Sequence, residues 1–188
     1  MPGENLTRIE AAERAELLSV ESYEVTLDLT TSDKTFASNT RVVFNCNKPG
    51  TETFIDAITD KVFAITLNGE SLDPATHSDG VRIKLPNLKE HNELFIEADA
   101  LYMNTGEGLH RFVDPVDNEV YLYTQFEVPD SRRMFAVFEQ PDLKARFSFN
   151  ITAPKHWQVI SNQPTPEPTE IEGDKAVWQF ESTPRISS

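Results

Sequence analysis

Residues 23–29 read Tyr-Glu-Val-Thr-Leu-Asp-Leu, an alternation of apolar and polar side chains that decides the class of fold. Successive side chains of a strand point to opposite faces, so this alternation gathers the apolar set on one face. The same period returns in residues 40–46, 81–85, 147–151 and 176–180. Each of these stretches is therefore predicted to be a half-buried β-strand.

Two further segments extend the strand pattern. Residues 62–67 form a dense apolar run, and the Asn68-Gly69 pair that follows is the strongest short signal for a hairpin turn. Residues 94–96 add a short strand candidate. Many short strands together with 12 prolines favour an all-β fold, an antiparallel β-sandwich, over alternating strands and helices.

One short helix is predicted at the N-terminus, before the first strand. Thr7 and Glu10 have the spacing of a capping box, in which each side chain satisfies a free backbone N–H at the helix start. Residues 11–18 consist of Ala, Glu, Arg and Leu, which are good helix formers. After Ser19 the period changes to that of a strand.

A chain of 188 residues suits one large domain or two small ones. Residues 161–175 hold three prolines and four acidic residues, a composition that fits either an interdomain linker or a long loop. The strand pattern of residues 176–180 follows at once, which favours the loop. Residues 1–188 are therefore expected to form a single domain.

The chain is strongly acidic, with 17 Lys and Arg against 31 Asp and Glu and a formal net charge of −14. Such a surface repels phosphate backbones and anionic lipids, which disfavours nucleic-acid and membrane partners. No stretch approaches the roughly 20 apolar residues of a membrane span, and the charged N-terminus does not have the pattern of a signal peptide. A cytoplasmic location is therefore expected.

The chemistry-bearing residues form no catalytic constellation on their own. Cys46 is the single cysteine, which excludes an internal disulfide, and its alternating apolar neighbours indicate a thiol in the core. None of the four histidines has a partner four residues away, so no helix presents two imidazoles to one metal ion. A Ser/His/Asp triad stays open, because spacing alone does not test it. Composition and periodicity indicate an acidic cytoplasmic β domain and no more.

Residues 124–147, TQFEVPDSRRMFAVFEQPDLKARF, mix several phenylalanines with charges of both signs, which suggests a buried connector with specific polar partners. Here the chain resembles the N-terminal domain of the M1 family of zinc aminopeptidases, in the aminopeptidase N group. The matching segments are residues 108–112, 123–127, 130–135, 138–141 (Phe-Glu-Gln-Pro), 144–147, 161–162 and 183–187. Residues 6–11 and 19–23 look like the actinobacterial branch of that family.

The resemblance implies that residues 1–188 are the noncatalytic N-terminal β domain of a longer enzyme, a saddle-like structure that caps the active site. The family's HExxH zinc-binding helix and its GxMEN substrate-binding strand belong to the next domain, and neither motif occurs in this chain. The full-length protein would then be a zinc aminopeptidase that removes N-terminal residues from peptides. Its partners would be the substrate N-terminus and the catalytic domain of the same polypeptide. No catalytic residue, metal ligand or cofactor is expected within this chain.

The resemblance also carries two substrate-binding residues into this sequence. The family's Gln-x-Glu corresponds to Gln125 and Glu127. Glu127 is expected to offer its carboxylate to the protonated α-amine of the substrate, and Gln125 to line the pocket for the first side chain. The leukotriene hydrolase branch has Gln-x-Gln at this place, so Glu127 favours the aminopeptidase branch.

Other interpretations of the same residues stay open. Glu127 could be an ordinary loop carboxylate and Gln125 an amide at a strand edge. The chain could also be a free-standing β-sandwich module that binds a protein or a carbohydrate, since it carries no catalytic set. The discriminating feature is whether the reading frame continues into an HExxH sequence.

Several neighbours of this pair are assigned structural or docking roles. Arg132 and Arg133 are interpreted as hydrogen-bond and ion-pair donors that hold the connector, and residues 138–141 as a core anchor with an exit turn. Candidates for an apolar surface that docks on the rest of the enzyme are Phe112, Phe126 and Phe135.

Overall fold

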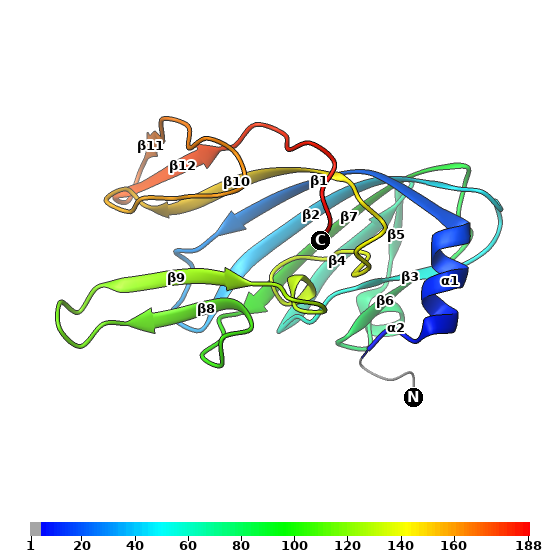
Figure 1. Cartoon of the computed structure of the whole chain (residues 1–188), viewed down its shortest axis with the longest axis horizontal. Coiled ribbons are helices and arrows are strands. Elements are labelled where there is room, and N and C mark those ends of the chain that lie inside the picture. The colour runs from blue at the N-terminus through cyan, green and yellow to red at the C-terminus, as the bar shows by residue number, and fades with distance from the viewer. Residues whose placement is uncertain (1–4) are drawn as a thin grey trace.

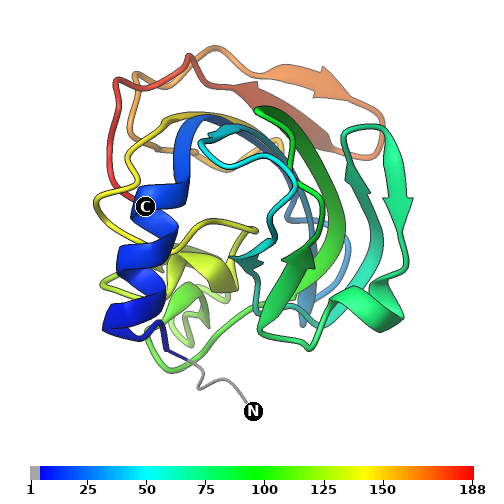
Figure 2. The same ribbon diagram turned by 90° about the vertical axis from the view of Figure 1, so that its right-hand side faces the viewer.

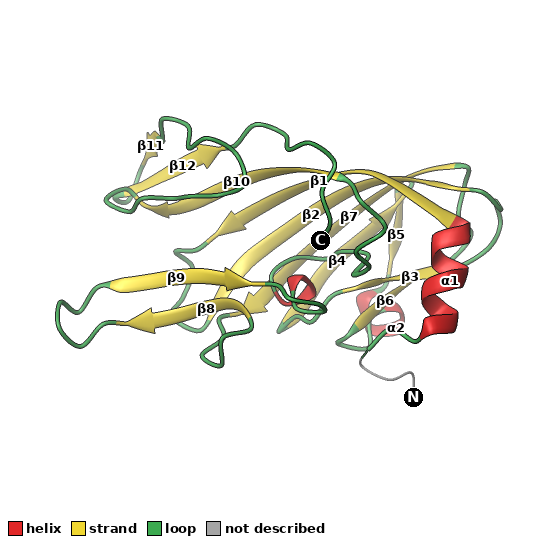
Figure 3. Cartoon of the chain, in the orientation of Figure 1, coloured by secondary structure: helices red, strands yellow, loops and turns green. Residues whose placement is uncertain are grey.

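A computed structural model describes residues 5–188, in which strands dominate (Figure 3). In chain order the helices and strands are α1 (Arg8–Leu17), β1 (Leu18–Asp28), β2 (Thr35–Cys46), β3 (Thr53–Asp56), β4 (Lys61–Leu67), β5 (Glu70–Leu72), α2 (Pro74–His77), β6 (Arg82–Leu85), β7 (His91–Leu101), β8 (Gly108–Val113), β9 (Val120–Gln125), the 3₁₀ helix η1 (Ser131–Arg133), β10 (Arg146–Pro154), β11 (Thr169–Ile171) and β12 (Lys175–Gln179). The all-β class predicted from the alternating patterns is confirmed.

The largest sheet has eight strands in the order β11-β12-β10-β1-β2-β7-β4-β5. It curves around the core, with α1 along one side (Figure 1 and Figure 2). Side chains of β1 and β2 alternate in burial along most of their length, as the sequence period predicts. Their buried faces share one hydrophobic cluster with Ile55 of β3 and Ile83 of β6. The large sheet and the smaller β3–β6 sheet thus enclose a common core, as expected for a β-sandwich.

One strand pair departs from the antiparallel arrangement. β1 and β10 are parallel, with Tyr23 beside Phe147 and Val25 beside Phe149. The other pairs of named strands in the described chain are antiparallel. Alternation determines which face a side chain takes but not the direction of the neighbouring strand. The antiparallel prediction therefore fails at this junction alone among the named strand pairs of residues 5–188.

Most of the short-range predictions are confirmed. Thr7 and Glu10 make both hydrogen bonds of the capping box at the start of α1. Asn68 and Gly69 have φ values of 55° and 84° and form the turn between β4 and β5. The thiol of Cys46 is buried at the end of β2. Most of the segment 161–175 is loop, interrupted by the three-residue strand β11.

The β8–β9 hairpin, which we call the arm, forms a separate two-stranded sheet that lies alongside the large one (Figure 1). Leu109 and Leu122 share the inner face of the arm and pack against the core. Phe112 and Tyr121 face each other on the opposite side, where they are 46% and 50% exposed. The alternation analysis did not predict these strands, because both faces of the arm carry apolar or aromatic side chains.

Two further expectations are wrong, for the same physical reason. Phe135 is not a surface residue: it is 4% exposed and packs edge-on against Phe126 and Phe149. Arg82, expected on the polar side of its strand, is buried, because α1 covers that side of β6 and supplies Glu10 as a partner. In both cases segments elsewhere in the chain cover the side chain, and local alternation does not predict such contacts.

Candidate functional site

Gln125 and Glu127 lie together at the end of the arm. Gln125 is the last residue of β9, and Glu127 follows in the turn that leads to η1. Both side chains are exposed. The Glu127 backbone N–H donates a hydrogen bond of 2.7 Å to the side-chain Oε1 of Gln125. This bond joins the two residues as one unit.

The Glu127 carboxylate and the Gln125 Nε2, which take no part in this bond, face solvent. Within residues 5–188, the Glu127 carboxylate accepts no hydrogen bond and forms no ion pair, and the Gln125 Nε2 has no partner. The next acidic residue in the sequence, Asp130, is paired with Arg133 at 2.8 Å. The arrangement thus leaves one carboxylate and one amide N–H₂ group, on residues joined by a hydrogen bond, available to an incoming ligand.

Gly108 explains how the strand end reaches this position. It pairs with Gln125 across the arm and has a φ of 58°, in the left-handed region. A Cβ atom at position 108 would lie 2.8 Å from the Arg133 Cβ. Glycine is therefore required both by the backbone conformation and by the close approach of the segment that follows Glu127.

The segment between the site and the core is residues 126–134, which we call the connector. It contains a cis peptide bond between Val128 and Pro129 and the single turn of η1. The buried hydroxyl of Ser131 donates to the Glu139 carboxylate, and the Arg132 N–H donates to the same oxygen, Oε2, at 2.8 Å. The Arg132 guanidinium donates to Asn5 Oδ1 at 3.2 Å and that of Arg133 pairs with Asp130, which agrees with the structural roles expected for the two arginines.

Residues 138–141 form the other side of this contact. Phe138 is fully buried and meets Phe44 edge-on, with ring centroids 5.2 Å apart. Pro141 is exposed at the start of a turn that the Leu143 N–H closes by donating to the Gln140 carbonyl at 3.0 Å. The interpretation of Phe138 as a core anchor and of Pro141 as an exit turn is confirmed.

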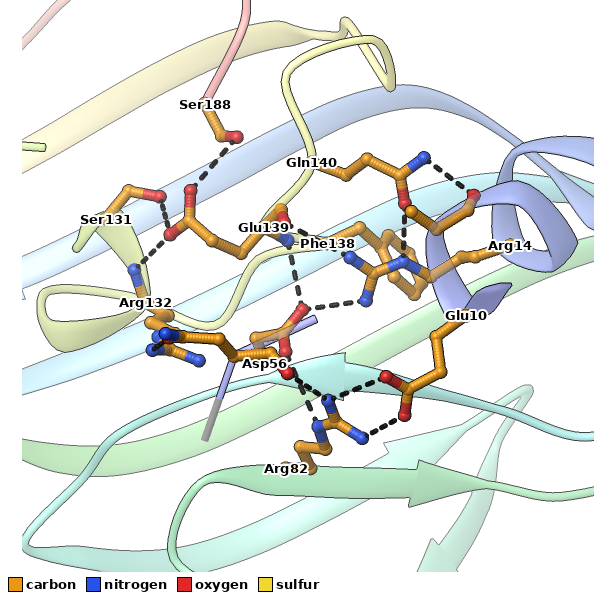
Figure 4. A network of polar contacts seen from close by, with 12 residues as sticks. Glu10, Arg14, Asp56, Arg82, Ser131, Arg132, Phe138, Glu139, Gln140 and Ser188 are labelled. Carbon is orange, nitrogen blue, oxygen red and sulfur yellow. Dashed lines mark hydrogen bonds and ion pairs between the residues drawn. The ribbon is translucent and has the colours of Figure 1, made fainter. Parts of the chain in front are cut away.

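A buried polar network holds residues 138–141, the segment that contacts the connector (Figure 4). Arg14 of α1 and Asp56 of β3 form an ion pair of 2.7 Å, with side chains 2% and 1% exposed. The Arg14 Nε donates to Gln140, and its Nη2 donates to the Glu139 carbonyl. Arg82 extends the network to Glu10 at 2.6 Å. The helix, the β3–β6 sheet and residues 138–141 are thus joined by charge-assisted hydrogen bonds.

Sequence patterns did not reveal this network. Its best signal is Asp56, an acidic residue inside the apolar run Phe-Ile-Asp-Ala-Ile of residues 54–58. A charge in such a position is expected to have a buried partner. The identity of that partner depends on the packing of α1, 42 residues away in the chain.

The pair of Glu10 and Arg82 makes stability depend on pH. The hydrogen bond from the Arg82 guanidinium lowers the pKa of Glu10 from 4.5 to about 2. A carboxyl whose pKa is lowered by folding stabilises the fold at every pH above its unfolded-state pKa of 4.5. This stabilisation is lost as the pH falls from 4.5 toward 2. We expect Glu10→Gln to lower the free energy of unfolding at neutral pH by roughly 1–2 kcal/mol, because the partly exposed side chain is screened by solvent.

Urea unfolding of the chain and of Glu10→Gln at several pH values tests this expectation. The gap between the two should be full at about pH 7 and small at about pH 2, where the carboxyl is protonated in the unfolded state and about half protonated in the folded state. Since Gln also serves at this position of a capping box, the helix cap is preserved in the variant. A gap that does not change with pH would contradict the assignment to the ion pair.

Two hollows lie near the site, and neither is lined by Gln125 or Glu127. One, of about 510 Å³, separates the arm from the large sheet and is lined by Trp157, Tyr121 and Tyr123 among others. The other, of about 530 Å³, lies between α1 and residues 139–142. The pair therefore sits on an open surface, where its charge is enclosed only if a further domain covers it.

The side chains present do not fit the zinc that the resemblance implies. Within residues 5–188, no group of three or more His, Cys, Asp or Glu side chains is placed to hold a metal ion. His110 is stacked on Tyr123 and accepts a hydrogen bond from the Gly106 N–H, and His91 is hydrogen-bonded to Asn45.

Neither helix in the described part of the chain has the length and apolarity that a membrane span requires.

Comparison with known proteins agrees with the motifs. The chain matches the family described as the peptidase M1 N-terminal domain over residues 19–188. It is 57% identical over 191 residues to Aminopeptidase N of Streptomyces lividans, which covers 100% of this chain and 22% of that protein. Probable aminopeptidase 2 of Sulfurisphaera tokodaii is 27% identical over 173 residues, with 92% and 21% covered. Aminopeptidase Ey of Gallus gallus is 28% identical over 201 residues, with 91% and 20% covered.

The chain spans about a fifth of the length of these curated relatives. The family match includes the arm, the connector and residues 138–141, and it leaves out α1. Identity to the Streptomyces lividans protein extends over the whole chain, α1 included. The chain therefore belongs to the family of peptidase M1 N-terminal domains.

Proposed function

We propose that the longer polypeptide is a cytoplasmic zinc aminopeptidase, and that residues 1–188 form its noncatalytic cap domain. In this role the domain covers an active site whose zinc is held by the following domain. Glu127 binds the protonated α-amine of the peptide substrate, and Gln125 lines the pocket for the first side chain. The observation that carries the proposal is the exposed carboxylate of Glu127, which has no partner among residues 5–188, on the residue bonded to Gln125 in a domain of this family.

Electrostatics explains why an exposed carboxylate suits this task. An ammonium–carboxylate pair at about 4 Å gains about 1 kcal/mol in water but about 4 kcal/mol at an effective dielectric constant near 20. The domain alone leaves Glu127 in water, so selection for a free N-terminus requires the cleft to close around it. Glu127 forms no ion pair with any other described side chain, so its carboxylate is available to an ammonium ligand.

Gln125 has a more restricted role than its amide would suggest. Its Oε1 already uses one of its two lone pairs to accept the Glu127 N–H, whereas both N–H groups of Nε2 are available to a substrate. Gln125 is thus a hydrogen-bond donor in the pocket, and it also orients the backbone of Glu127.

Glu127→Ala in the full-length polypeptide tests the proposal. We expect KM for aminoacyl-anilide substrates to rise by one to two orders of magnitude, roughly 1.4–2.7 kcal/mol, with a matching fall in kcat/KM. The reason is the loss of the ionic contact to the α-amine, which the substrate makes before and during the reaction. Steady-state kinetics measures both parameters.

The matched control is Glu119→Ala, which removes an exposed carboxylate from the far end of the same arm. Its KM should stay within about twofold of the parent. An unchanged KM for Glu127→Ala would show that Glu127 is an ordinary loop carboxylate without a role in substrate binding. A reading frame without a downstream HExxH sequence would favour the alternative, a free-standing binding module.

A further inference from the structure

Phe126, which precedes Glu127, packs against Phe135, but no apolar side chain between Glu127 and η1 is buried. Val128 is exposed, and the chain between Glu127 and η1 makes its first buried side-chain contact at Ser131. The connector is then fixed at Arg132, whose N–H donates to Glu139 at 2.8 Å and whose carbonyl accepts the Ile58 N–H at 2.8 Å. The peptide units around η1 are thus held from two sides.

Glu139 makes both of its strong side-chain contacts to the connector. Its Oε2 accepts from the Ser131 hydroxyl and from the Arg132 N–H, and its Oε1 has a longer contact of 3.4 Å to the Ser188 hydroxyl. Figure 4 shows this carboxylate turned toward Ser131 and Arg132, away from Arg14. The side chain therefore acts on the segment that carries Glu127.

The backbone of Glu139 is held separately. Its N–H donates to the Asp56 carboxylate at 3.1 Å, and its carbonyl accepts from the Arg14 guanidinium at 3.2 Å. Both partners belong to the buried ion pair that joins α1 to β3. Glu139 is thus held at its backbone by Asp56 and Arg14 and bonded through its carboxylate to the connector. We call its hydrogen bonds to Ser131 and Arg132 the bracket.

A carboxylate in this place has an energetic cost. The side chain of Glu139 is nearly inaccessible to solvent, and this burial raises its pKa above the ordinary value. The negative charge of Asp56 adds to the rise in pKa, whereas the hydrogen bonds from Ser131 and Arg132 oppose it. Buried ionisable groups often contribute less to stability than apolar residues of similar size. A role other than stability is the better explanation for Glu139.

We propose that Glu139 is a positioning residue for the substrate site: through Ser131 and Arg132 it sets the place of the connector and hence of Glu127. This inference rests on the proposed function of Glu127. It adds that the conformation of the amine-binding residue is controlled from the buried Phe-Glu-Gln-Pro segment. Gln125 restrains the Glu127 backbone from one end, and Glu139 restrains the chain that follows it from the other.

A double-mutant cycle in the full-length polypeptide tests this inference. Ser131→Ala removes one of the two hydrogen bonds of the bracket, and Glu139→Gln weakens both by removing the charge of the acceptor; each is combined with Glu127→Ala. We expect each single variant to raise KM for aminoacyl-anilides about tenfold with kcat within about twofold. In the Glu127→Ala background, either change should raise KM by less than about twofold, because the residue that the bracket positions is absent.

The control is Glu10→Gln, another Glu-to-Gln change in the same polar network but at the far side of Arg82. It loses stability without touching the connector, so KM should stay within about twofold in both backgrounds. Ser131→Ala carries the test if Glu139→Gln does not fold, as judged by circular dichroism.

The outcomes separate the two claims. If Glu127→Ala raises KM while the bracket variants leave KM unchanged or act equally in both backgrounds, the inference is overturned and the proposed function stands. If Glu127→Ala leaves KM unchanged, the proposed function fails, and the inference fails with it. Strong coupling between Glu139 and Glu127 supports both.

Discussion

Asp56→Asn is expected to lower the free energy of unfolding of this chain by about 3–5 kcal/mol. The substitution keeps the shape of the side chain but removes the negative charge that faces Arg14. Arg14 and Asp56 are 2% and 1% exposed, so water cannot replace the lost partner. The remaining guanidinium would be a buried, uncompensated charge, which is far more costly than the absence of the whole pair.

The large sheet offers a matched control. Arg41 and Glu93 have the same N–O distance, 2.7 Å, but their side chains are 41% and 58% exposed. Glu93→Gln should lower the free energy of unfolding by no more than about 1 kcal/mol, because solvent screens the pair. Urea unfolding of both variants measures the two values. Similar losses for Asp56→Asn and Glu93→Gln would show that burial does not govern the strength of these pairs.

Phe138→Ala is the second change with a large expected effect, about 3–5 kcal/mol of unfolding free energy. Phe138 is fully buried, and its ring lies edge-on to Phe44 and 5.7 Å from the Arg14 guanidinium. Its backbone N–H also donates to the Tyr23 hydroxyl at 3.1 Å. Truncation would leave a cavity where the two layers meet, and close-packed surroundings refill such cavities only in part.

Two variants calibrate this prediction. Phe138→Leu keeps most of the buried volume and should cost roughly 1–2 kcal/mol. Phe63→Ala removes the same ring from a side chain that is 45% exposed on β4, so its loss should be about 1 kcal/mol or less. Urea unfolding again gives the values. A loss for Phe138→Ala as small as that for Phe63→Ala would contradict its role as a core anchor.

Asp56 and Phe138 both contact or adjoin Glu139, so changes to the stability of the core also affect the substrate site. Asp56 holds the Glu139 backbone, and Phe138 precedes it in the buried segment. Damage to either residue should therefore loosen the bracket as well as the core. For this reason the gentler changes at Ser131 and Glu139 are the informative ones for function, whereas Asp56 and Phe138 report on the fold.

Short-range patterns determined the elements of this protein. The alternation in residues 23–29 fixed which side chains of β1 face the core, and the Thr7–Glu10 box fixed where α1 begins. Asn68-Gly69 fixed the turn after β4. These features rest on interactions within a few residues, such as capping bonds, positive φ and the two-residue period of a strand. The motifs around residues 124–147 likewise indicated the family from the sequence alone, and comparison with known proteins confirmed it.

The tertiary structure alone decided how those elements meet. It made β10 the parallel neighbour of β1, turned Phe135 into the core and buried Arg82 beneath α1. It also brought Arg14 to Asp56 across 42 residues and Glu139 to Ser131 on the connector. Such contacts depend on which distant surface covers a given face, and no local period encodes that choice. The sequence identified Gln125 and Glu127 as a candidate pair, whereas their exposure and the bracket behind them follow from packing between segments far apart in the chain.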